Sequence, residues 1–212
     1  AARLKPLFDA VLAVLPFEPA AMERLDGPPT CYVGHPALAE ALPPHGAPDR
    51  GPLVLLPGSR AGELRRHLPV MAELVETLAD HPAVSELVIP TLPRLHERLR
   101  AETKGWPKPV RIVSDREMRR ELYVSAVAAL CVSGTATLEL GLARLPTVVI
   151  YALDGHQARI YARLGRPPVS LPNIIAGRTV VPEIVATPLA AAAIEPVISG
   201  LLSNKKARQD QM

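Results

Sequence analysis

Aromatic residues are scarce in this sequence: two phenylalanines, one tryptophan and four tyrosines make up 3% of 212 residues. The chain therefore has little material for the stacking platforms that bind single-stranded nucleic acid. Charge argues against the same partner, because 24 basic residues are nearly balanced by 21 acidic ones and the formal net charge is only +3. We expect no nucleic-acid partner.

The sequence also lacks a cysteine framework, a membrane span and a metal-ligand cluster. Cys31 and Cys131 lie far apart in apolar runs, which predicts two buried free thiols in a reducing compartment. No apolar stretch reaches the roughly 18 residues of a transmembrane helix, and the first residues show no signal-peptide pattern. The six histidines show no ligand spacing, so we expect no metal and no cofactor. These absences predict a cytoplasmic protein, at most peripheral on a membrane.

Proline is abundant instead, with 24 residues spread along the chain, and the 48% of hydrophobic residues can build a proper core. Residues 63–79 carry apolar side chains three and four apart, which predicts a helix that either starts after Pro69 or kinks there. Strands alternating with helices predict an α/β fold, a Rossmann-like parallel sheet with flanking helices. The short apolar runs that predict buried parallel strands are 11–15, 53–56, 87–90, 110–113, 127–132 and 147–152.

A Pro- and Gly-rich stretch after residue 36 predicts a linker and a domain boundary near residue 48. We therefore expect a separate piece with its linker over 1–48, the main domain over 49–202 and a fraying polar tail over 203–212. A helix is expected just before that tail, despite Pro196.

In an open parallel sheet, ligands bind where strands end and helices begin. The first such loop, after 53–56, contains Gly58, Ser59 and Arg60. Gly58 permits close approach of a ligand, Ser59 supplies a hydroxyl, and Arg60 carries a forked donor that matches phosphate oxygens. The alternative is a plain turn with an exposed arginine.

The second loop follows the run at 127–132 and contains Ser133, Gly134 and Thr135, with Thr137 in the helix that follows. Exposed N–H groups and the three hydroxyls of this segment form a neutral cradle for a diphosphate. Glu139, in the first two helical turns, is placed to accept both hydroxyls of a ribose. The alternative role of Glu139 is a favourable interaction with the helix dipole.

The third segment, 170–183, is an irregular stretch that carries Asn173, Arg178 and Glu183. Polar residues on a loop beside a rigid sheet are disproportionately functional. The alternatives are a turn role for Asn173 and an ion pair between Arg178 and Glu183.

Five segments, in this order and approximate spacing, resemble the C-terminal half of lipid-A-disaccharide synthase, a GT-B-type glycosyltransferase with two Rossmann domains. They are LPFEP at 15–19, VGHP at 33–36, LLPGSR at 55–60, SGTATLEL at 133–140, and SLPNIIAGR with VVPE at 170–183. The resemblance implies that 49–202 is the C-terminal, UDP-binding domain and that 1–48 is a remnant of the N-terminal acceptor domain.

The resemblance further implies transfer of 2,3-diacylglucosamine from its UDP derivative to 2,3-diacylglucosamine 1-phosphate, with release of UDP and without a metal. Arg60 and the segment from Ser133 to Thr137 would hold the diphosphate, and Glu139 the ribose. Asn173 and Arg178 would line the cleft. The general base is expected in the N-terminal domain, so the fragment alone should be inactive, and His35 is more simply a structural residue.

By analogy with the family, two copies would pair through their C-terminal segments. The acyl chains of the two substrates imply that the enzyme acts at the inner face of the inner membrane. Three arginines of 155–168 would contact anionic lipid there, unless they form a solvated helix face. Two other functions stay open. One is another UDP-sugar enzyme of the same architecture, a glucosaminyltransferase or a 2-epimerase, and the other is a non-catalytic nucleotide-binding module.

Overall fold

The structure is a computed structural model that describes residues 1–42 and 45–212. Contacts between Cα atoms divide the chain into two compact units, Ala1–Ala41 and Leu42–Met212. The larger unit thus begins earlier than the boundary expected near residue 48, because Leu42 and Ala47 are buried in it. Residues 43–44 of the expected linker lie outside the described residues.

The smaller unit contains two parallel strands, β1 (Val11–Ala13) and β2 (Thr30–Tyr32). Strand β1 confirms the apolar run at 11–15, whereas the short β2 was not predicted. Cys31 in β2 is exposed, so the expectation of two buried thiols is wrong for this one. The remaining elements of this unit are η1 (Ala2–Leu4), α1 (Glu18–Arg24) and η2 (Pro36–Glu40).

His35 has a local structural role in the smaller unit. Its Nδ1 accepts a hydrogen bond from the backbone N–H of Ala37 at 3.0 Å and so caps η2. This agrees with the structural alternative considered for His35.

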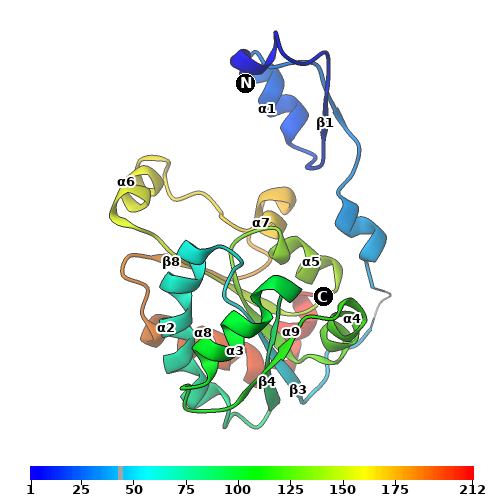
Figure 1. The fold of residues 1–212 in the computed structure, drawn as a ribbon. Helices are drawn as coiled ribbons and strands as arrows, with labels where there is room; N and C mark the ends of the chain where they lie inside the picture. The colour runs from blue at the N-terminus through cyan, green and yellow to red at the C-terminus, as the bar shows by residue number, and fades with distance from the viewer. Residues whose placement is uncertain (43–44) are drawn as a thin grey trace. The chain divides into compact units, whose positions relative to one another are not determined.

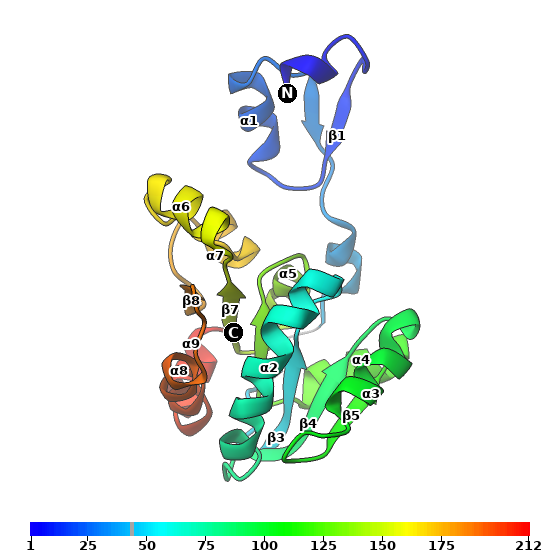
Figure 2. The same cartoon turned by 60° about the vertical axis from the view of Figure 1, so that its left-hand side comes forward.

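The larger unit is built on a six-stranded sheet in which every neighbouring pair of strands is parallel. Helices cover both faces of this sheet (Figures 1 and 2). This confirms the predicted α/β class and the five remaining apolar runs, while β8 was not predicted. In spatial order the strands are β5 (Val110–Val113), β4 (Val84–Pro90), β3 (Gly51–Leu56), β6 (Ala128–Val132), β7 (Thr147–Ala152) and β8 (Glu183–Ala186).

The longest helix, α2 (Ala61–Leu78), contains Pro69 in its interior, so it does not start after that proline. Buried side chains three and four residues apart face the sheet, namely Leu64, Leu68, Met71, Val75 and Leu78. The other helices of this unit are η3 (Pro93–Leu95), α3 (His96–Thr103), α4 (Arg116–Ser125), α5 (Ala136–Leu142), α6 (Gly155–Arg163), α7 (Leu171–Ala176), α8 (Ala191–Ser203) and α9 (Lys205–Asp210).

Alternating side chains of the central strands supply the cores on the two faces. Leu53 and Leu55 of β3 join the cluster that includes the apolar faces of α2 and α8, whereas Val54 joins the cluster with α4 and α5. All three are at most 1% exposed. Burial on both faces explains why this strand is a continuous apolar run.

His67 ties α2 to the end of β7. Its Nδ1 lies 2.8 Å from the carbonyl oxygen of Glu63, and its Nε2 accepts a hydrogen bond from the N–H of Ala152 at 2.9 Å. The carbonyl can only accept, so the proton is on Nδ1 and the ring is neutral. Burial is the main cause that lowers the pKa of His67, with a further contribution from the charge of Arg66.

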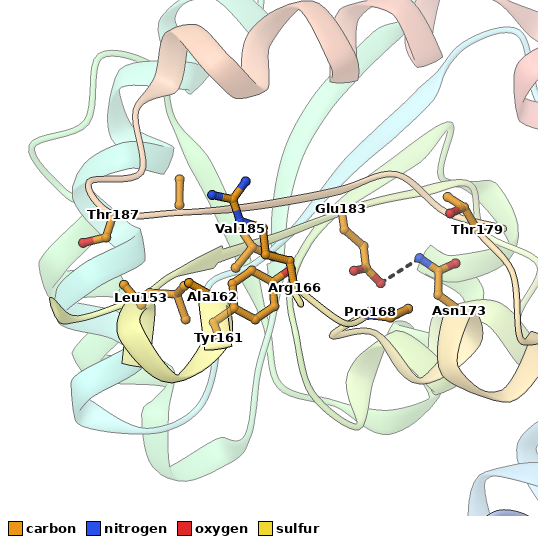
Figure 3. Close-up of a pocket in the computed structure, with 12 residues that line it drawn as sticks. Leu153, Tyr161, Ala162, Arg166, Pro168, Asn173, Thr179, Glu183, Val185 and Thr187 are labelled. Atoms are coloured by element: carbon orange, nitrogen blue, oxygen red, sulfur yellow. Dashed lines mark hydrogen bonds between the residues drawn. The ribbon is translucent and has the colours of Figure 1, made fainter. Parts of the chain in front are cut away.

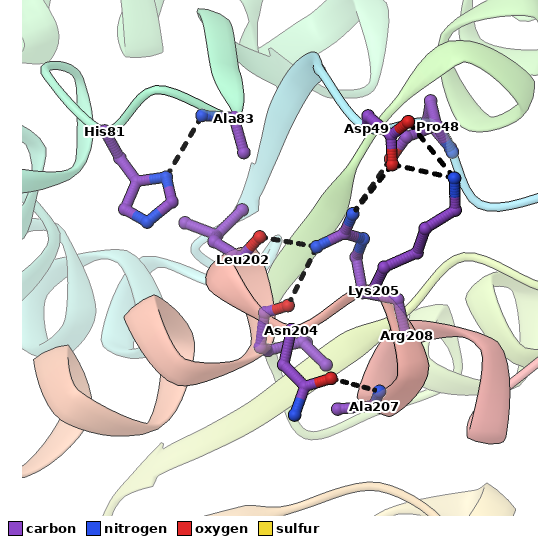
Figure 4. Close-up of polar contacts among 10 residues, drawn as sticks. Pro48, Asp49, His81, Ala83, Leu202, Asn204, Lys205, Ala207 and Arg208 are labelled. Atoms are coloured by element: carbon purple, nitrogen blue, oxygen red, sulfur yellow. Dashed lines mark hydrogen bonds and ion pairs between the residues drawn. The ribbon is translucent and has the colours of Figure 1, made fainter.

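The expected fraying tail is a packed helix. Arg208 of α9 is 2% exposed, and its guanidinium donates hydrogen bonds to the carbonyl oxygens of Leu201, Leu202 and Pro48 (Figure 4). The same guanidinium lies 3.8 Å from the carboxylate of Asp49. A buried cation that satisfies three carbonyls fixes α9 against the start of β3.

The strand order places a topological switch point between β3 and β6. From β3 the chain runs outward through β4 to β5, and it then returns to β6 on the other side of β3. Loops that leave these two central strands diverge and leave a crevice at the carboxyl edge. The segments around Gly58 and Gly134 follow β3 and β6 directly.

Candidate functional site

A cavity of about 370 Å³ opens at this switch point, and we call it the switch-point cavity. It brings together seven of the ten residues singled out from the sequence, namely Gly58, Ser59, Arg60, Ser133, Gly134, Thr135 and Glu139. Among the other lining residues, four carry polar side chains that the sequence analysis did not single out, namely Glu63, Thr91, Arg119 and Tyr123.

Gly58 is required by the geometry of the β3–α2 loop. Its φ of +98° lies in the region that favours glycine. A Cβ added there would lie 2.6 Å from Oε2 and 2.7 Å from Cβ of Glu63. The loop therefore depends on the close approach of Glu63 to its backbone.

Glu63 organises this loop through its carboxylate. Oε2 accepts hydrogen bonds from the N–H groups of Ser59 at 3.0 Å and Arg60 at 3.1 Å, and Oε1 accepts one from Nη1 of Arg60 at 2.8 Å. Burial acts to raise the pKa of Glu63, but these backbone and guanidinium hydrogen bonds outweigh it and the pKa lies below its ordinary value. Glu63 is thus an anion at neutral pH.

Glu63 occupies some hydrogen-bond donors of the β3–α2 loop and leaves others free for a ligand. The N–H groups of Ser59 and Arg60 are occupied by Glu63, whereas the side chain of Arg60 is 85% exposed and, among the described residues, bonds through Nη1 alone. A guanidinium has five N–H donors, so Arg60 retains a free edge for phosphate oxygens.

The turn between β6 and α5, residues 133–137, offers backbone donors to the same cavity. The N–H groups of Gly134, Thr135 and Ala136 find no acceptor in the described part of the chain. The Thr135 hydroxyl is likewise without a partner there, and the residue is exposed. Three successive free N–H groups form a concave site for an anion.

The hydroxyls of Ser133 and Thr137 differ from the expectation. The Ser133 hydroxyl donates to the carbonyl oxygen of Val169 at 2.6 Å, and the Thr137 hydroxyl donates to that of Gly134 at 2.7 Å. Thr137 is also 2% exposed and is not among the lining residues. Because both protons are used inside the protein, we no longer assign these hydroxyls as diphosphate donors.

Glu139 lies half-buried on the wall of the cavity, and its carboxylate has no hydrogen-bond or ion-pair partner among the residues that the structure describes. Its charge reaches the neighbouring side chains: burial first, and the charge of Glu139 second, raise the pKa values of Tyr123 and Cys131. The guanidinium of Arg119, on α4, carries the opposite charge at the same cavity. A carboxylate with free acceptor capacity can bind two vicinal hydroxyls.

Asn173 and Arg178 do not lie at the switch-point cavity. Asn173 is 2% exposed and lines a separate cavity of about 540 Å³ (Figure 3). Arg178 is exposed and forms no ion pair with any described residue, so the alternative pairing with Glu183 is not observed either. The switch-point cavity therefore gives no support to the expected cleft-lining role, because neither Asn173 nor Arg178 is among the residues that line it.

Residues 1–42 and 45–212 contain no group of three or more His, Cys, Asp or Glu side chains that could hold a metal ion. Within the same residues, no helix has both the length and the apolar character needed to cross a bilayer.

The parallel sheet with helices on both faces defines an α/β domain of the GT-B type, and known structures share this fold. A crystal structure of the GtfA/B complex aligns with a TM-score of 0.61 at 13% identity, over 99% of this chain and 42% of that one. A mutant of S. aureus TarM in complex with fondaparinux, α-GlcNAc-glycerol and UDP aligns with a TM-score of 0.59 at 10% identity, over 99% and 41%. These likenesses concern the fold.

A family model described as lipid-A-disaccharide synthetase matches residues 1–212, and the chain belongs to that family. The lipid-A-disaccharide synthase of Rhodopseudomonas palustris is 38% identical over 96% of this chain and 54% of its own length. That of Nitrobacter winogradskyi is 36% identical over 99% and 55%. The chain therefore spans about half the length of the curated relatives that it matches.

Proposed function

We propose that this chain forms the nucleotide-sugar-binding half of a glycosyltransferase of lipid A biosynthesis. The reaction moves 2,3-diacylglucosamine from its UDP derivative to 2,3-diacylglucosamine 1-phosphate and releases UDP. Family membership supports the reaction class. The observation that carries the site is that the three unpartnered N–H groups and the free donors of Arg60 belong to residues that line one and the same cavity, the switch-point cavity.

The proposed roles follow from where charge develops. When the sugar leaves, negative charge grows on the diphosphate, and donors already oriented toward it stabilise the transition state. The N–H groups of Gly134, Thr135 and Ala136, the hydroxyl of Thr135 and the guanidinium of Arg60 supply those donors. Glu139 binds the ribose hydroxyls. No general base is assigned to this chain.

The test of the site is calorimetric titration of the chain with UDP. We expect a Kd in the micromolar to millimolar range, about −8 to −4 kcal/mol. Arg60→Ala and Glu139→Ala should each weaken it by about ten- to a hundredfold, because each removes a charge-assisted interaction worth about 1.5–3 kcal/mol. Arg100→Ala, an exposed arginine of α3 outside the cavity, is the control. Equal affinities for all four chains would contradict the assignment.

We further propose that α6 contacts an anionic membrane surface at the inner face of the inner membrane. Ile160 and Leu164 are exposed, at 44% and 67%, beside a group of arginines. An exposed apolar pair flanked by cations suits the boundary of anionic lipid headgroups. Sedimentation with anionic liposomes should fall several-fold when the three arginines become glutamine, with neutral liposomes as the control; unchanged sedimentation would exclude the contact. The arginines are Arg159, Arg163 and Arg166.

A further inference from the structure

Glu183, the first residue of β8, is the centre of a dense hydrogen-bond cluster outside the switch-point cavity. Its carboxylate accepts from Nδ2 of Asn173 at 2.7 Å and from the hydroxyl of Ser170 at 2.5 Å. It also accepts from the N–H groups of Ser170 at 3.0 Å and Val169 at 2.9 Å. Figure 3 shows the Glu183–Asn173 pair on the wall of the second cavity. Three of the four bonds fix residues 169–170 to the start of β8, and the fourth joins α7 to it.

Asn173 completes the cluster from α7. Its Nδ2 donates a second hydrogen bond to the carbonyl oxygen of Val181 at 2.9 Å, and its Oδ1 accepts from the N–H groups of Val180 at 2.7 Å and Val181 at 3.0 Å. A side-chain amide has two donor hydrogens and two acceptor lone pairs, so all of its capacity is used. Asn173 has nothing left to offer a substrate, and its role is to hold the chain around it.

The segment held by this cluster, residues 169–171, touches the β6–α5 turn at two points, and we call it the strap. The carbonyl oxygen of Val169 accepts the Ser133 hydroxyl at 2.6 Å, and the N–H of Leu171 donates to the Thr137 hydroxyl oxygen at 3.3 Å. Ser133 and Thr137 stand immediately before and after the three free N–H groups. The strap therefore fixes both ends of the anion-binding turn.

We propose that Glu183 and Asn173 are positioning residues for the β6–α5 turn: they hold the strap, and the strap aims the three N–H groups at the diphosphate. This inference rests on the proposed function, because it takes UDP as the ligand of that turn. Neither residue touches the nucleotide. The effect passes through Ser133, whose contact with the strap is the shorter of the two.

Such an arrangement is sensitive to small shifts. Hydrogen bonds weaken steeply once their angle departs from linear, and three donors must keep their direction together. In Glu183→Gln an NH₂ group replaces one acceptor oxygen and confronts the donors of the strap. A resulting displacement of the turn should weaken UDP binding by about tenfold, since misplacement of about 1 Å can cost up to about a hundredfold.

The experiment is a double-mutant cycle in UDP affinity with Glu183→Gln and Ser133→Ala. Each single variant should bind about tenfold more weakly, and the double variant should be no weaker than either single one, because both break the same connection. Glu195→Gln is the matched control: this half-buried carboxylate accepts a hydrogen bond from Ser199 within α8, at 2.8 Å, and its loss should leave the affinity unchanged. Circular dichroism and thermal unfolding verify that each chain is folded.

The outcomes separate the two proposals. If the folded wild-type chain does not bind UDP, the proposed donor site and the positioning role both fail. If the wild type binds and Glu183→Gln binds equally well, or if the two losses multiply to about a hundredfold in the double variant, only the positioning role is overturned. Should Glu183→Gln not fold, Ser170→Ala removes the 2.5 Å contact while keeping the carboxylate, and the same cycle is run with it.

Discussion

Replacement of Gly58 by alanine tests the close packing on which the β3–α2 loop depends. The φ of +98° alone costs a residue with a Cβ about 1–2 kcal/mol. The new Cβ would also lie 2.6–2.7 Å from two atoms of Glu63, so that side chain must move. Movement releases the N–H groups of Ser59 and Arg60 from the carboxylate, and charge-assisted hydrogen bonds are worth about 1.5–3 kcal/mol each. Because Ser59 and Arg60 are exposed, water replaces much of what these two hydrogen bonds contribute, and we expect a total loss of about 2–4 kcal/mol in the free energy of unfolding.

The assay is urea denaturation followed by circular dichroism, with Gly62→Ala as the matched control. Gly62 lies in the first turn of α2, four residues from Gly58, and a Cβ there meets nothing within 4 Å. Alanine at that position should stabilise the chain by up to about 1 kcal/mol, because alanine is the better helix former. If Gly58→Ala proves as stable as the wild type, the loop does not need the Glu63 contact and our account of it is refuted.

Two further predictions concern stability. Burial lowers the pKa of His67 in the folded chain, so this side chain stays neutral there, whereas the unfolded chain binds a proton below about pH 6.5. The free energy of unfolding should therefore fall by up to about 1.4 kcal/mol per pH unit as the pH drops below that value. His67→Gln should flatten this slope and the exposed His156→Gln should not; equal slopes would refute the assignment. Arg208→Ala leaves three carbonyls without their donor and should lower the free energy of unfolding, measured with urea, by about 3 kcal/mol. Lys206 is 80% exposed, so Lys206→Ala should lower it by less than about 1 kcal/mol. Similar losses for the two variants would contradict the packed tail.

The sequence predicted the strands in which consecutive residues are buried, because such strands are continuous apolar runs. Strand β3 is buried along nearly its whole length, and its apolar run marks it plainly. Strand β8 escaped prediction because all four of its residues are only half-buried, and β2 because it has three residues that are half-buried or exposed. The tail over 203–212 looked disordered because its composition is polar. Its order comes from partners elsewhere in the chain, which bind Arg208 and Gln211.

In the site, too, the sequence revealed the residues with a local signal and missed those whose role depends on distant contacts. Gly58, Arg60 and Gly134 were found because strand-to-helix loops at a switch point carry local signals of glycine and cation. The partner of the Ser133 hydroxyl lies 36 residues away, so no local pattern could show that its proton is used. Glu63 and Arg119 were missed for a related reason: on an amphipathic helix, a charged residue that faces a cavity has the same sequence signature as one that faces solvent.

The charges around the switch-point cavity indicate how it selects an anion. Arg60 and Arg119 are balanced by Glu63 and Glu139, so the lining has no formal excess of positive charge. In the proposed site, attraction to a diphosphate therefore comes from hydrogen-bond donors on the lining residues: the free N–H groups of the Arg60 guanidinium and the three unpartnered backbone N–H groups of the β6–α5 turn. Glu63 serves this end twice, since it orients Arg60 and occupies the N–H groups of its own loop. That leaves the β6–α5 turn as the proposed backbone site for phosphate oxygens. The hydrogen-bond cluster of Glu183 and Asn173 then has a role in this site, because it fixes the position of that turn.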